Sequence, residues 1–137
     1  FSNKIMQALR GYADSFEQTS IDEAYLDVTS KVQGSFEAAR DLAEKMKREV
    51  KNEVGIAFSV GVGPNKLVAK IAADSQKPDG LTVVKPEEVE RFLSPLPVNR
   101  LLGVGRKTAA LKQNCSNSRL FCNHPLRGKY HFFFYLF

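Results

Sequence analysis

The residues most able to do chemistry are two adjacent acids, Asp22 and Glu23, within "SIDEAYLD" (residues 20–27). Aromatic and β-branched residues flank this stretch, with Phe16 before it and Val28 after it, which favours two short strands joined at or near the acids. Adjacent acids inside one strand would point to opposite faces. Two interpretations stay open: a hairpin turn, where Asp is common, or a metal site, where carboxylates bind a hard divalent cation such as Mg²⁺.

Three lysines are a second candidate group. Lys66 and Lys70 lie one turn apart on a predicted helix, and Lys77 lies just past its end. Such a group could hold a polyphosphate beside metal ions bound by the acids, although lysines more often form a solvated helix face. The glycine-rich turn at 61–66 has neither P-loop nor dinucleotide-binding spacing, so we interpret it as a tight turn.

A glycine pair near the C-terminal end is the third candidate. In "LLGVGRKTAALK" (residues 101–112), Gly103 and Gly105 precede Arg106 and Lys107, and an alanine-leucine helix follows. This is typical of a helix-hairpin-helix element, whose backbone N–H groups contact nucleic-acid phosphates without reading sequence. The alternative is an ordinary connection between two helices.

The composition changes abruptly at residue 114. Residues 114–137 contain three basic residues, no acids, and an aromatic run at 131–137. Both cysteines and both histidines lie here as well, but the spacing C-x6-C-x-H-x6-H fits no structural zinc pattern. The net charge of +5 is partly a property of this tail, so it is weak support for nucleic-acid binding.

The apolar pattern up to residue 93 predicts the order α-β-β-α-β-α-β-α. The predicted elements are 2–12, 14–19, 23–29, 35–52, 55–63, 65–76, 81–84 and 86–93. We expect an α+β fold, in which the helices at 35–52 and 65–76 cover one face of an antiparallel sheet. The chain has 137 residues, no apolar run long enough for a bilayer and no signal-peptide pattern, so we expect a cytoplasmic protein with no membrane partner.

Together these segments resemble the Y-family translesion DNA polymerases, in particular their DNA polymerase IV-like branch. "SIDEAYLD" resembles the catalytic palm signature, "SVGVGPNKLVAKIAADSQKPDGLTVV" a later palm segment, and "LLGVGRKTAALK" the helix-hairpin-helix that begins the thumb. The resemblance implies a ferredoxin-like palm over 1–94 and the start of a thumb over 95–113. Residues 114–137 match no part of the family pattern, as expected for a frameshifted or mispredicted reading frame or a decayed gene.

The resemblance also implies roles for individual residues. Asp22 and Glu23 would be metal ligands, with Glu23 the catalytic carboxylate, in nucleotidyl transfer with two Mg²⁺ ions. Lys77 would contact the incoming deoxynucleoside triphosphate. Residues 103 and 105–107 would lie near the backbone of a primer-template DNA, giving salt-sensitive binding. A sliding clamp is a further candidate partner of the intact protein.

The family pattern contains parts that this sequence does not match. They are an earlier palm strand with another metal-binding aspartate, the fingers, and the little finger, so we expect no primer extension by the chain alone. Three functions therefore stay open: part of an error-prone polymerase for DNA damage tolerance, a non-catalytic DNA-binding remnant of one, and a nucleotide cyclase-like palm. The helix-hairpin-helix motif argues against the last of these.

Overall fold

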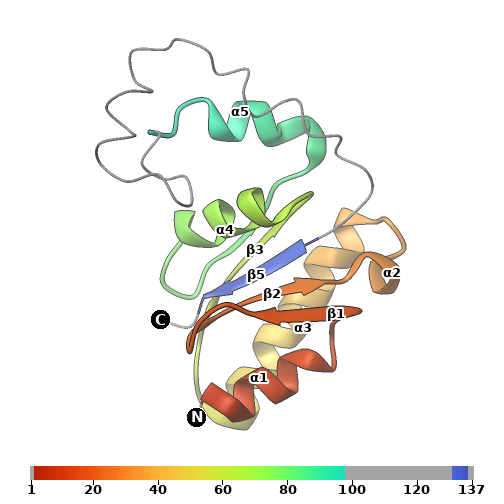
Figure 1. Cartoon of the computed structure of the whole chain (residues 1–137), viewed down its shortest axis with the longest axis vertical. Coiled ribbons are helices and arrows are strands. Elements are labelled where there is room, and N and C mark those ends of the chain that lie inside the picture. The colour runs from red at the N-terminus through yellow and green to blue at the C-terminus, as the bar shows by residue number, and fades with distance from the viewer. Residues whose placement is uncertain (1, 98–130, 136–137) are drawn as a thin grey trace.

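The computed structural model describes residues 2–97 and 131–135 (Figure 1). In chain order the elements are α1 (Ser2–Arg10), β1 (Ser15–Gln18), β2 (Glu23–Asp27), α2 (Thr29–Val32), α3 (Phe36–Val54), β3 (Ser59–Gly63), α4 (Lys66–Ser75), β4 (Leu81–Val83), the 3₁₀ turn η1 (Pro86–Glu88), α5 (Val89–Leu93) and β5 (His131–Tyr135).

Most of the predicted elements are present. The order up to residue 93 is confirmed, with the short helix α2 as an addition that the sequence did not predict. The strand predicted at 55–63 is shorter, since only Ser59–Gly63 is paired with neighbouring strands. No helix within 2–97 has both the length and the apolar character needed to cross a bilayer.

Local capping explains where the two long helices begin and end. At Ser35, the predicted N-cap of α3, Oγ accepts a hydrogen bond from Ala38 N at 3.1 Å. The same helix ends at Gly55, whose φ of 76° is the left-handed conformation that glycine adopts without strain. For α4, Asn65 Oδ1 accepts from Val68 N at 2.9 Å.

The sheet has five strands in the order β1-β2-β5-β3-β4. β1 and β2 form an antiparallel hairpin, and β5 runs antiparallel to both β2 and β3. β4 pairs with β3 in the parallel direction, so the sheet is largely antiparallel rather than wholly so, which corrects the sequence-based expectation. In Figure 1, β5 lies in the middle of the sheet, between the first half of the chain and the second.

The aromatic run of the unmatched tail contributes a strand that the sequence did not predict. Residues 131–135 form β5, which pairs on both sides, with β2 and with β3. Aromatic residues suit a pleated strand. Because β2 and β3 do not pair with each other, the inserted strand β5 supplies hydrogen-bond partners for the facing edges of both. Residues 1, 98–130 and 136–137 lie outside the described residues. They include the first part of the unmatched tail, residues 114–130.

One face of the sheet carries the main hydrophobic core. Alternate residues of β2 and β3 point to this face and pack against α1 and α3. The largest fully buried side chains are Phe58, Ile5, Leu9, Leu26, Met46, Val28, Val50 and Val60. Burying side chains of this size stabilises the fold by about 1.5–3 kcal/mol each.

The opposite face carries α4. A Cβ built on Gly61 would lie 1.9 Å from Ala69 O, so α4 packs directly on the backbone of β3. Ala69 and Ala73 of this helix also contact Tyr25 of β2. α3 and α4 therefore cover opposite faces, as Figure 1 shows, and the expectation that they share one face is wrong.

The alternation of residue size along β3 explains this arrangement. Val60 and Val62 point toward α3, while Gly61 and Gly63 leave the other face open for a close helix. All five residues of β3 are buried, as in a strand covered on both faces. α4 is also covered by the segment that follows the sheet, because Val68 and Ala72 pack in one cluster with Val84 and with Val89 of α5.

Candidate functional site

The paired acids lie at the turn of the β1–β2 hairpin. Asp22 precedes β2 and Glu23 is its first residue, as the sequence predicted. The turn is closed by backbone hydrogen bonds, in which Thr19 N and Ser20 N donate to Glu23 O at 3.0 and 3.3 Å. Ser20 Oγ donates to Asp22 Oδ1 at 2.7 Å. The hairpin thus presents two neighbouring carboxylates, of which one is oriented by a hydroxyl.

Glu23 points to the face of the sheet that α4 covers. Lys70 Nζ of α4 lies 3.3 Å from Glu23 Oε1, and both side chains are only about a fifth exposed, at 20% and 19%. A carboxylate removed from water to this degree needs a cationic or hydrogen-bonding partner, and Lys70 supplies one.

A second ion pair lies beside the first. Glu17 of β1 pairs with Lys66 of α4, and Lys66 Nζ also lies 5.3 Å from the centroid of the Tyr25 ring. Glu17 and Tyr25 are directly opposite in the β1–β2 register, which places both on the α4 face. Two lysines one helical turn apart therefore meet two acids from the hairpin, and the charges of both acids act on Tyr25.

Burial and the negative charges of this cluster raise the pKa of Tyr25. Its pKa is raised from 10.0 to about 12, chiefly because burial disfavours the phenolate, and further because the charges of Glu23, Glu17 and Asp74 oppose ionisation. Asp74 belongs to α4, so carboxylates from three elements act on one phenol.

We expect Tyr25 to make the fold sensitive to alkaline pH. The folded chain keeps the phenolic proton where the unfolded chain, with a pKa near 10.0, releases it. This contribution to stability is therefore complete below pH 10 and is lost between about pH 10 and 12. Across this window the free energy of unfolding should fall by up to about 2 kcal/mol more for the native chain than for Tyr25→Phe. Urea titrations at a series of pH values measure this; parallel losses in both chains would contradict it.

Lys77 lies in the loop between α4 and β4. Its Nζ is 2.7 Å from Asp74 Oδ1, and the two side chains are about a quarter exposed. Because the charge of Asp74 also acts on Tyr25, the Asp74–Lys77 pair adjoins the cluster formed by the hairpin acids. Each of the three lysines singled out in the sequence thus has an acidic partner.

Two acids of this cluster, Glu17 and Asp74, were not predicted from the sequence. Glu17 could have been found by pairing the two strands across the turn, which sets it opposite Tyr25. Asp74 lies four residues after Lys70, on the same side of its helix. The predicted DNA-contacting residues Gly103, Gly105, Arg106 and Lys107 lie outside the described residues.

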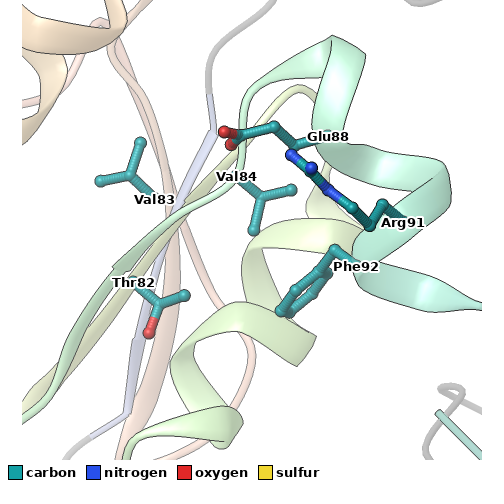
Figure 2. A pocket seen from close by; sticks show the side chains of 6 residues that line it. All are labelled: Thr82, Val83, Val84, Glu88, Arg91 and Phe92. Atoms are coloured by element: carbon teal, nitrogen blue, oxygen red, sulfur yellow. The ribbon is translucent and has the colours of Figure 1, made fainter. Parts of the chain in front are cut away.

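A small open pocket lies between β4 and α5, at another part of the molecule (Figure 2). Its volume is about 220 Å³, below the range of typical small-molecule sites. The lining residues are Thr82, Val83, Val84, Glu88, Arg91 and Phe92. Glu88 is already used as a helix cap, since its Oε2 accepts from Lys85 N at 3.1 Å. The pocket contains none of the predicted site residues.

Comparison with protein families matches two consecutive parts of the chain. Residues 1–74 match the family described as impB/mucB/samB, and residues 86–114 match the helix-hairpin-helix motif of that family. The second match covers the "LLGVGRKTAALK" stretch.

Named relatives are DNA polymerases. The DNA polymerase IV of Methanoculleus marisnigri is 58% identical over 107 residues, covering 78% of this chain and 29% of that protein. The DNA polymerase IV of Saccharolobus solfataricus is 51% identical over 105 residues, covering 77% and 30%. This chain therefore spans about 30% of the length of these relatives.

Solved structures agree with the relatives. An insertion ternary complex of Dbh DNA polymerase superposes with a TM-score of 0.78 at 47% identity, covering 84% of this chain and 33% of that one. The crystal structure of DinB from Sulfolobus solfataricus superposes with a TM-score of 0.76 at 48% identity, covering 82% and 33%. Because the family match extends over more than half of the sequence, the chain belongs to the impB/mucB/samB family, a group of Y-family, DinB-like DNA polymerases.

Proposed function

We propose that this chain contributes the catalytic palm and the start of the thumb to an error-prone translesion DNA polymerase that performs template-directed nucleotidyl transfer. Residues 1–94 would be the palm portion and residues 95–113 the helix-hairpin-helix. The observation that carries the proposal is the Asp22–Glu23 pair at a hairpin turn, on a fold that superposes on a ternary complex of Dbh DNA polymerase.

The donor atoms at the hairpin fit Mg²⁺. Asp22 and Glu23 offer hard carboxylate oxygens, and Mg²⁺ in polymerase-type sites is held by one or two carboxylates, water and substrate phosphates. Among residues 2–97 no group of three metal-ligating side chains forms a site by itself. This donor set supports weak binding of Mg²⁺ by the protein alone. A bound nucleotide would supply further oxygen ligands from its phosphates. When bound, Mg²⁺ would lower the pKa of the attacking hydroxyl and neutralise the leaving pyrophosphate.

Lys70, Lys77 and the helix-hairpin-helix would hold and orient the reactants. Lys70 balances the charge of Glu23 at 3.3 Å and directs the carboxylate toward α4. Lys77 would bind the triphosphate of the incoming nucleotide, exchanging its ion pair with Asp74 for phosphate oxygens. Arg106 and Lys107, with the backbone at Gly103 and Gly105, would contact the phosphates of a primer-template duplex.

A chimeric polymerase tests the proposal directly. The segment of Methanoculleus marisnigri DNA polymerase IV that this chain matches is replaced by the corresponding residues of this chain, and primer extension is measured with Mg²⁺. We expect extension by the chimera. Glu23→Gln should lower kcat at least about a hundredfold, since it removes negative charge where the metal ions are held.

Glu17→Gln is the matched control for this experiment. Glu17 is also a lysine-paired acid on the α4 face, but it is 57% exposed and lies on the neighbouring strand. We expect its chimera to extend primers at nearly the unchanged rate. Equal losses for the two substitutions, or an inactive chimera that still binds duplex DNA, would contradict a catalytic role and favour a DNA-binding remnant.

A further inference from the structure

The loop that carries Lys77 is fastened from the far side of the sheet by Lys47 of α3. Its ammonium donates to Asp79 Oδ1 at 2.6 Å, to Phe58 O at 2.7 Å and to Gly80 O at 3.1 Å. These are three acceptors for the three protons of a lysine. The Lys47 side chain is only 16% exposed, and its Nζ lies 5.8 Å from the centroid of the Phe58 ring.

The same loop is held tightly at its downstream end. Gly80 N donates to Ser59 Oγ at 3.2 Å, and Gly80 O accepts from Val60 N at 3.0 Å as well as from Lys47. A Cβ at Gly80 would lie 1.9 Å from Gln76 O, so the backbone passes very close to the end of α4. Asp79 adopts a φ of 53°, in the left-handed region, and in this conformation its carboxylate pairs with Lys47.

Lys77 thus lies between two attachment points. Upstream, α4 ends at Ser75 and Asp74 holds the Lys77 ammonium at 2.7 Å. Downstream, the attachment at Asp79 and Gly80 reaches α3, which lies on the opposite face of the sheet from α4. An ammonium withdrawn from water to this degree is costly to dehydrate unless it is fully paired, and Lys47 has three acceptors.

We infer that Lys47 is a positioning residue: by fixing Asp79 and Gly80 it sets the direction of Lys77, and through Lys77 it raises the affinity of the chain for a nucleoside triphosphate. This inference rests on the proposed function for its ligand. The attachment itself is independent of any ligand, so its geometry can be tested separately.

The first experiment uses the chain without ligand. Accessible lysines of the full chain are acetylated, and labelling at Lys77 is quantified by mass spectrometry. Lys47→Met keeps the apolar stem and removes the ammonium. We expect it to raise the labelling rate of Lys77 about threefold or more, because the loop opens locally. Asp79→Asn removes the same ion pair from the other side and tolerates a positive φ, so it should act in the same direction.

Lys51→Met is the matched control. Lys51 lies one turn after Lys47 on α3 and approaches the same carboxylate, but at 4.0 Å and with 63% of its side chain exposed. We expect no change in Lys77 labelling. If Lys47→Met and Asp79→Asn leave Lys77 labelling unchanged as well, the positioning role is overturned.

The second experiment measures binding of dATP with Mg²⁺ by calorimetry in a double-mutant cycle. Lys47→Met should weaken binding about fivefold, and this effect should vanish when Lys77 is already replaced in Lys77→Gln, because Lys47 acts through Lys77. Additive effects would assign Lys47 a purely structural role and overturn the inference. If Lys77→Gln alone leaves dATP binding unchanged, the nucleotide role of Lys77 fails, and the labelling result still decides whether Lys47 positions the loop.

Discussion

Replacing Gly61 with alanine should prevent the chain from folding stably. The added Cβ would lie 1.9 Å from Ala69 O and 2.3 Å from Ala73 N, and both are backbone atoms of α4 that cannot rotate away. To accommodate it, α4 would have to lift off β3 and expose the contact with Tyr25. We expect a loss of about 4 kcal/mol or more, a large share of the stability of a small domain. Urea unfolding followed by circular dichroism measures this loss.

Gly11→Ala serves as the control for that substitution. Gly11 follows α1, and a Cβ there would lie 3.4 Å from Ala8 O, close to ordinary contact distance. Its effect should stay within about 0.5 kcal/mol. Equal unfolding midpoints for Gly61→Ala and Gly11→Ala would show that α4 leaves room for a Cβ at Gly61.

Phe133→Pro should disrupt the sheet at its centre. Phe133 is opposite Tyr25 on one side and Gly61 on the other. Proline removes an N–H donor and is excluded from central strands, so we expect a loss of about 3 kcal/mol and lower solubility, because β2 and β3 become exposed edges. Phe133→Val keeps the N–H and a residue suited to strands, and should remain folded. A Phe133→Pro chain as stable and soluble as Phe133→Val would show that β5 is dispensable.

Local features of this fold could be predicted from the sequence. The hairpin with Asp22 and Glu23 at its turn, the N-cap at Ser35 and the helical stripes of α3 and α4 all depend on residues a few positions apart. Spacing and residue type record such short-range relations directly. The acidic pair of the candidate site was found in this way.

Long-range features were not predictable in the same way. The alternation of valine and glycine along β3 shows that one face can accept a close helix, but it does not show that α3 and α4 pack on different faces of the sheet. The partners of Lys47 are far away in the sequence, at Phe58 and Asp79. The aromatic run was not assigned to a strand, because the pairing of β5 requires strands from the opposite end of the chain.

The place of β5 in the sheet also affects how the protein is made. The strand at the centre of the sheet is the last of the five to leave the ribosome, and its first residue pairs with Asp27 and Gly63, which are synthesised long before. Until then the nascent chain holds two unfinished half-sheets, β1–β2 and β3–β4, each with an open edge. Such late closure over a long stretch of sequence slows folding and leaves unpaired strands available to chaperones or to neighbouring nascent chains.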